Sequence, residues 1–231
     1  MIAKVTYVHQ SSFLVETGSA SLLFDFAGGI MPIFSEGKEI YVIVTHDHAE
    51  HYSKAIFSLA DQYPNVRYLL SSDVPLEDVP ELVQEKTVFL APNTTWKDSC
   101  VQVETYGAND EGIALWCHVD GVDIYHSGDL NNWFWGKGQE DPEAEKAYYA
   151  VLDKLAGHCF DIAFIPVDPR LGDDYYRGLD DFMKKADARH IYPMHFWYDY
   201  SIIEKVKALP CTEAYRDRIA NIVSEDDFFV F

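Results

Sequence analysis

Residues 40–51 read Ile-Tyr-Val-Ile-Val-Thr-His-Asp-His-Ala-Glu-His, and this stretch decides the fold. Its first five residues are continuously apolar, which predicts a short strand buried on both faces. The polar loop that follows carries His46, His48 and His51 within six positions, together with two carboxylates. Neutral imidazole suits divalent metals, and open α/β sheets place ligands at the carboxyl ends of their strands. The stretch therefore predicts a metal site, and the alternative is a solvated loop with a chance cluster of histidines.

The rest of the chain alternates in a way that predicts two β-sheets. Strand patterns dominate the first half, and helical spacing alternates with strands in the second half. We therefore expect one α/β domain over residues 1–231, a four-layer αββα sandwich with helices on the outer faces of two packed sheets. The expected strands are residues 12–17, 21–26, 40–44, 66–70, 87–90, 100–106, 113–118, 122–126, 161–167 and 189–193, and the expected helices are 54–60, 140–156, 176–186 and 201–209.

Charge excludes some classes of partner. The 18 basic and 38 acidic residues give a net charge of −20, so the chain repels a phosphate backbone and lacks the basic stripe of nucleic-acid-binding proteins. It also lacks a polybasic patch for a membrane surface, and no run of about 18 apolar residues predicts a membrane span. We expect a small-molecule substrate, no nucleic-acid or membrane partner, and a chain that is free to form a homo-oligomer.

Cysteine usage predicts a reducing compartment. Cys100, Cys117, Cys159 and Cys211 are isolated, and none forms the C-x-x-C pair of a thiolate zinc site or a redox motif. Isolated cysteines fit the cytosol better than a disulfide framework. The first residues show no signal-peptide pattern, so we expect a cytoplasmic protein.

Several motifs, in order along the chain, resemble one known family. The H-x-H-x-E-H pattern after the apolar strand is similar to the H-x-H-x-D-H signature of the metallo-β-lactamase superfamily. The resemblance covers nearly the whole chain and is closest to the branch around L-ascorbate-6-phosphate lactonase. The other matching pieces are the opening hairpin at 7–16, the strand 22–25, the strand 124–129 that ends in Gly-Asp, and Pro193-Met194-His195.

The resemblance implies a metal-dependent hydrolase and a set of ligands. In the family pattern, His46 and His48 bind a first metal, while Glu50, His51 and His195 bind a second and Asp129 bridges the two. A set of histidines and carboxylates suits one or two Zn²⁺ ions per chain, and Mn²⁺ or Fe²⁺ also fit it. Such ions lower the pKa of bound water to about 7, and Asp129 and Glu50 would orient this nucleophile toward an electrophilic carbonyl or phosphorus centre.

Two departures from the family pattern bear on activity. Glu50 stands where the family has Asp, and its extra methylene moves the carboxylate to a different point. The third histidine of the first site is not evident in residues 106–112, and we expect Asp110 to substitute for it. Because catalytic metal sites usually have three protein ligands, a metal-binding scaffold with little catalysis is the alternative to an enzyme. A phosphodiesterase or nuclease is a second alternative, disfavoured by the charge of −20.

Four more residues are candidates for the surroundings of the metals. His9 lies in the opening hairpin, and His126 lies on the strand before Asp129, where strand alternation points the two side chains apart. Each histidine is predicted either to contact and orient the metal ligands or to be an ordinary surface or core residue. Asp168 and Arg170 follow a buried strand. We expect Arg170 either to bind an anionic substrate through two hydrogen bonds or to form ion pairs with neighbouring acidic residues.

Overall fold

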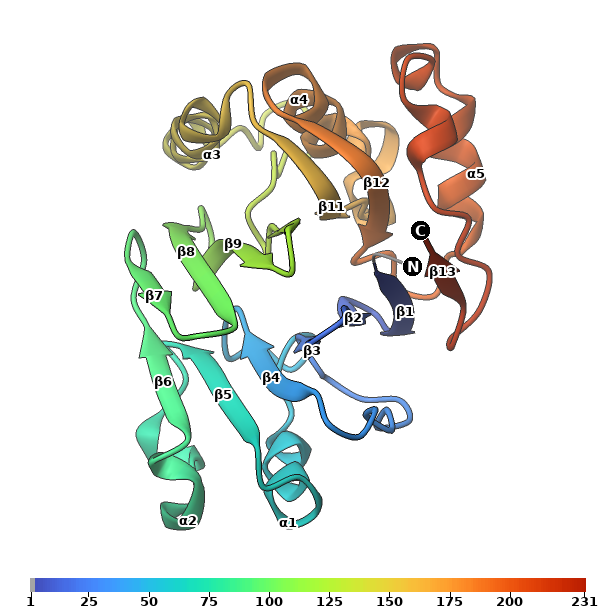
Figure 1. Cartoon of the computed structure of the whole chain (residues 1–231). Helices are drawn as coiled ribbons and strands as arrows, with labels where there is room; N and C mark the ends of the chain where they lie inside the picture. The colour runs from blue at the N-terminus through green and yellow to red at the C-terminus, as the bar shows by residue number, and fades with distance from the viewer. Residues whose placement is uncertain (1–2) are drawn as a thin grey trace.

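The computed structural model describes residues 3–231, and two β-sheets form its centre (Figure 1). The first sheet has seven strands in the order β13 (Phe228–Val230), β1 (Lys4–His9), β2 (Ser12–Glu16), β3 (Ala20–Phe24), β4 (Glu39–Val44), β5 (Val66–Ser71) and β6 (Thr87–Leu90). The second has six strands in the order β12 (Asp187–Met194), β11 (Cys159–Pro166), β10 (Val122–His126), β9 (Ile113–Val119), β8 (Val101–Gly107) and β7 (Thr95–Lys97).

Helices lie beyond the outer face of each sheet, as Figure 1 shows for α1 and α2 on one side and α3 and α4 on the other. One hydrophobic core lies between the sheets and under the second-half helices, and another lies under α1 and α2. This confirms the predicted two-sheet α/β sandwich. The helices are α1 (Leu59–Gln62), α2 (Glu81–Gln84), α3 (Pro142–Leu155), α4 (Arg177–Lys185) and α5 (Ser201–Ala208), with 3-10 turns at Lys54–Ser58, Leu76–Asp78, Pro169–Asp174, Pro210–Thr212 and Arg216–Arg218.

Parallel pairing explains where the loops gather. In the first sheet β3 pairs in parallel with β4, and in the second β10, β11 and β12 pair in parallel. The carboxyl ends of parallel neighbours lie at the same edge, so the loops after β3 and β4 meet, as do those after β10, β11 and β12. The polar residues that follow these five strands are therefore brought together at one end of the sandwich.

The structure corrects some element boundaries. The segment 54–60 was expected to be one helix, but it is a 3-10 turn capped by the Ser53 side chain and followed by the short α1. Strands β7 and β13 and helix α2 were not predicted. The two strands have too few residues to show an alternation of apolar and polar side chains, and the short α2 has no strong helical periodicity. Within residues 3–231, no helix has the length and hydrophobicity that crossing a bilayer requires.

Candidate metal centre

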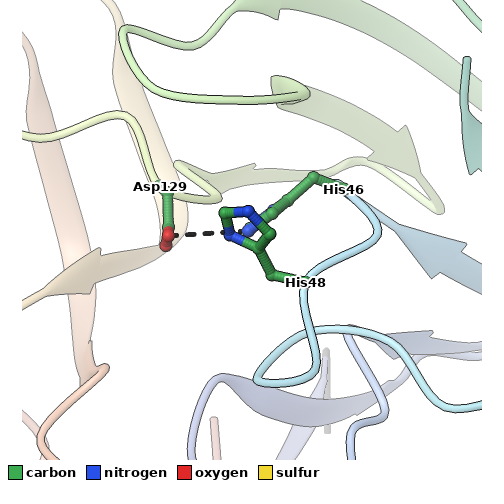
Figure 2. Close-up of side chains that lie close together, drawn as sticks. All are labelled: His46, His48 and Asp129. Atoms are coloured by element: carbon green, nitrogen blue, oxygen red, sulfur yellow. Dashed lines mark ion pairs between the residues drawn. The ribbon is translucent and has the colours of Figure 1, made fainter. Parts of the chain in front are cut away.

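Asp129 is the point on which four imidazoles converge. It follows β10, and its carboxylate meets two histidines of the loop after β4 and the histidine that directly follows β12. The Nε2 atoms of His46, His51 and His195 lie 3.5, 3.0 and 3.6 Å from its carboxylate oxygens. His48 belongs to the same group, and Figure 2 shows His46 and His48 projecting from one loop toward Asp129. The structure thus brings together five of the six residues that the family pattern implies as ligands. The sixth, Glu50, belongs to neither group and lines the adjoining cavity.

These residues form two groups that share one carboxylate. The donor atoms of His46, His48 and Asp129 lie within 4.8 Å of one another, and so do those of His51, Asp129 and His195. Two donors on a tetrahedral zinc ion, each about 2.0–2.2 Å from it, are separated by roughly 3.3–3.6 Å. The measured separations are close to this range.

Unpartnered atoms test whether the residues fit a metal. His46 Nε2, His51 Nε2 and Asp129 Oδ1 are buried and form no hydrogen bond of acceptable geometry within the described chain. Unpaired buried polar atoms are rare because each loses its hydration without compensation. Three of them facing one another form the kind of donor set that a divalent cation would satisfy, so the residues fit the ion that the fold implies.

Glycine explains how the Asp129 loop approaches the histidine loop. Gly128 has φ of +51°, and a Cβ atom there would lie 2.6 Å from the carbonyl oxygen of Ile113 and 3.0 Å from Thr45. A side chain at this position would push the two loops apart, so the Gly-Asp sequence is a steric requirement of the site.

A buried carboxylate behind the site orients His51. Asp25, which follows β3, is fully buried, and its Oδ2 lies 2.7 Å from His51 Nδ1. It also accepts hydrogen bonds from the backbone N–H and the hydroxyl of Thr45, each at 2.7 Å. Such a carboxylate fixes the ring and directs its other nitrogen toward a metal. Sequence reasoning assigned no role to Asp25, although its place at the carboxyl end of a strand next to β4 was a usable signal.

A second buried carboxylate, Asp168, plays the same part for His195. Its Oδ2 lies 2.9 Å from His195 Nδ1 and accepts a hydrogen bond from the Trp197 indole at 3.2 Å. The same carboxylate pairs with Arg170 at 2.6 Å. His195 and Trp197 have φ of +62° and +49°, a left-handed backbone that these contacts stabilise. Asp168 therefore positions both a metal-site histidine and a pocket cation.

The site perturbs the acidity of its members. Burial opposes ionisation of Asp129, but the positive charge of His51 and the close approach of the His46 and His51 imidazoles hold the pKa of its carboxyl well below the usual range. Burial likewise opposes protonation of His51, yet Asp129 and Asp25 outweigh it and raise the pKa of the imidazole to about 10. For Asp168, hydrogen bonds with His195 and Arg170 outweigh burial and lower the pKa to about 2. Burial also opposes ionisation of Asp25, but the charges of His126 and His51 outweigh it and lower the pKa of its carboxyl. Asp25, Asp129 and Asp168 are thus anions at neutral pH, as cation binding requires.

The remaining predicted residues lie around the centre. His126 is buried, with its Nε2 3.8 Å from Asp25, and burial lowers its pKa. His9 lies 2.7 Å from Glu225 and 3.1 Å from the Tyr198 hydroxyl, and it contacts no member of the two metal groups. No measured contact joins Asp110 to the histidines; the carboxylate that meets His48 is that of Glu111, at 3.1 Å. Sequence reasoning missed Glu111 because the chain has many acidic residues and the spacing of Glu111 does not distinguish it from the others.

A cavity of about 700 Å³ opens onto the centre. Its volume is within the usual range for sites that bind small molecules. Its wall includes the aromatic rings of Trp133 and Trp135, which stack with centroids 5.9 Å apart. The titratable side chains that line it are His48, Glu50, Asp110, Asp129, Glu140, Asp141, Arg170 and His195.

Comparison with known proteins places the fold. No family model matches the sequence, and no curated protein matches it. Among solved structures, the metallo hydrolase Igni18 from the hyperthermophilic archaeon Ignicoccus hospitalis has a TM-score of 0.63 at 17% identity, covering 99% of both chains. The metallo-β-lactamase fold protein YhfI from Bacillus subtilis has a TM-score of 0.63 at 14% identity, covering 98% of both chains. A candidate metal-dependent hydrolase from Parabacteroides distasonis has a TM-score of 0.61 at 18% identity, covering 94% of this chain and 91% of that one. The chain therefore has the metallo-β-lactamase fold.

Proposed function

We propose that this protein is a metal-dependent hydrolase that acts on a small molecule. One observation carries the proposal: a single buried carboxylate, Asp129, is shared by two groups of imidazoles, with buried nitrogens that have no hydrogen-bond partner. His46 and His48 would hold one ion with Asp129, and His51 and His195 would hold the other. Zinc is the expected metal, and Mn²⁺ and Fe²⁺ also suit these ligands.

The residues divide the chemistry between them. A divalent ion held by these histidines and Asp129 would supply a water with a pKa near 7 and a positive charge beside the substrate oxygen. Asp25 and Asp168 keep the rings of His51 and His195 oriented, so that little rearrangement is needed during the reaction. Glu50 lines the cavity beside Asp129, and its carboxylate is the group that we assign to accept a proton from the attacking water.

The charges of the cavity favour a small substrate with one anionic group. Arg170 lines the cavity with its side chain 46% exposed, and its guanidinium lies 4.4 Å from the centre of the Trp197 ring. The acidic walls that include Glu50 and Asp110 repel a polyanion, in line with the net charge of −20. A lactone, an ester or a phosphate monoester meets both conditions, and the sequence resemblance to the L-ascorbate-6-phosphate lactonase branch supports the same class.

Turnover by the zinc-loaded full chain tests the proposal. A panel of lactones, carboxylic esters, phosphate monoesters and phosphodiesters should include a small anionic substrate that is hydrolysed. Asp129→Ala should abolish that activity, whereas His118→Ala should retain it, because His118 is an exposed histidine paired with Asp123 away from the centre. Bound zinc without turnover of any substrate would favour a metal-binding scaffold, for which the replacement of the family's Asp by Glu50 is the supporting observation.

We also propose a cytoplasmic location, which the cysteines support. Cys100, Cys117, Cys159 and Cys211 are all free thiols in the structure. Free thiols persist in a reducing compartment, which supports our proposal of a cytoplasmic protein.

A further inference from the structure

A carboxylate outside the family pattern contacts a histidine of the first metal group. The Oε2 atom of Glu111 lies 3.1 Å from His48 Nε2. Glu111 belongs to the loop 108–112, which joins β8 to β9 directly above the histidine loop. This separation is close to that expected for two ligands of one zinc ion.

The loop is anchored so that residue 111 stays beside the histidines. Gly112 has φ of +72°, and a Cβ atom there would lie 2.1 Å from the carbonyl oxygen of Thr45 and 2.5 Å from His46 Cβ. The amide of Ile113 donates a hydrogen bond to the same Thr45 oxygen at 3.0 Å. Because Gly112 packs directly on the histidine loop, the backbone of the preceding residue, Glu111, is held next to His48.

The first group also lacks a carboxylate of its own. It contains two imidazoles and one oxygen of Asp129, and that carboxylate serves the second group as well. His46 Nε2 is fully buried, unpartnered and aimed at the group, so the position calls for a cation. One shared negative charge is a weak counterpart for two divalent ions, and a further carboxylate would improve the balance.

We propose that Glu111 is a protein ligand of the first metal, in the role for which the sequence suggested Asp110. The proposal rests on the proposed metal-dependent function. In the structure Glu111 forms a separate, exposed group with His48 and Asp47. Its side chain is 54% exposed, so its carboxylate is free to turn from that position toward His46 and Asp129 when an ion binds there. Asp110 lines the substrate cavity instead and is left to face the substrate.

Metal titration of the full chain tests this assignment without using activity. The metal-free protein is titrated with Zn²⁺ in competition with a chromophoric chelator, and Co²⁺ absorption spectra report the ligand field of each site. Glu111→Gln should weaken one of two sites at least tenfold and change the Co²⁺ spectrum of that site. Asp110→Asn, the adjacent carboxylate, should leave both affinities within twofold of wild type. Circular dichroism confirms that both variants fold.

The outcomes separate this inference from the proposed function. Two bound metals with unchanged affinities in Glu111→Gln would overturn the Glu111 assignment and leave the hydrolase proposal standing. Selective weakening by Asp110→Asn would overturn it in favour of the neighbouring residue. A wild-type chain that takes up neither Zn²⁺ nor Co²⁺ would overturn both proposals. The shorter variant Glu111→Asp should give an affinity between those of wild type and Glu111→Gln.

Discussion

His195 Nδ1 lies 2.9 Å from Asp168 Oδ2, and the same carboxylate also binds Arg170 and the indole of Trp197. The histidine that completes the second metal group and the cation on the cavity wall are therefore held by one buried anion. This arrangement couples the orientation of a metal ligand to that of a substrate-binding candidate. The loop that begins at His195 keeps its left-handed backbone while these contacts are made.

Removal of the Asp168 charge should weaken the second metal site. Asp168→Asn retains the size of the side chain but loses the anion that orients His195, so we expect the affinity of that site to fall about 10- to 100-fold. Asp173→Asn, which changes an exposed carboxylate on the following turn, is the matched control. Isothermal titration with Zn²⁺ measures both variants, and equal affinities for wild type and Asp168→Asn would contradict the positioning role.

Substitution of Gly112 should disrupt the contact between two loops. Gly112→Ala places a methyl group 2.1 Å from the Thr45 carbonyl oxygen, so the loops must separate in addition to the strain of a positive φ. Gly157→Ala is the control because its φ is +78° but no atom lies within 4 Å of the added carbon. The control should lose about 1–2 kcal/mol from backbone strain alone.

Chemical denaturation compares the two glycine variants. Gly112→Ala should lose more unfolding free energy than Gly157→Ala and should also bind Zn²⁺ more weakly at the first site. Similar losses in the two variants, with unchanged Zn²⁺ binding, would show that the loops do not need to touch.

A turn far from the metals should contribute to acid sensitivity. Asp120, in the β9–β10 turn, accepts hydrogen bonds from the backbone amide of Ser19 at 2.7 Å and from its hydroxyl at 2.8 Å, which join the two sheets. Burial opposes ionisation, but the hydrogen bonds together outweigh it and lower the pKa of the Asp120 carboxyl below its usual value. A lowered folded-state pKa gives stability that is present above the unfolded-state pKa and is lost as pH falls through the folded-state value.

Urea unfolding of Asp120→Asn as a function of pH checks this contribution. The variant should be less stable than wild type at pH 7, and the difference should shrink below about pH 4 as the wild-type carboxyl is protonated. A difference that stays constant from pH 7 to pH 3 would rule out the ionised Asp120 as its source.

The fold was largely predictable because its strands carry strong local patterns. The apolar run at 40–44 and the Asp120-Gly121 turn signal fixed neighbouring elements without any knowledge of the tertiary structure. Strands β7 and β13 were missed because three residues cannot display a two-residue alternation. Their pairing depends on contacts with distant segments, such as Phe229 opposite Val5, which local sequence does not encode.

The candidate site was predictable only where residues cluster in sequence or follow a known motif. His46, His48 and His51 stand out because they share one loop. Asp25 was marked only by its place at the carboxyl end of a predicted strand, from which no role follows without the pairing of β3 with β4. Glu111 reaches His48 through loop packing, and among 38 acidic residues no spacing marks it. Asp110 and Glu111 are neighbours, and only the direction of the side chain separates the one that contacts His48 from the one that lines the cavity.

Anomalous scattering from crystals of the zinc-loaded protein tests the central claim most directly, because it locates each ion and counts the ions per chain. The account predicts two peaks that flank the Asp129 carboxylate, one near His46 and His48 and the other near His51 and His195. Zinc found elsewhere on the chain, or no bound zinc at these histidines, would contradict it.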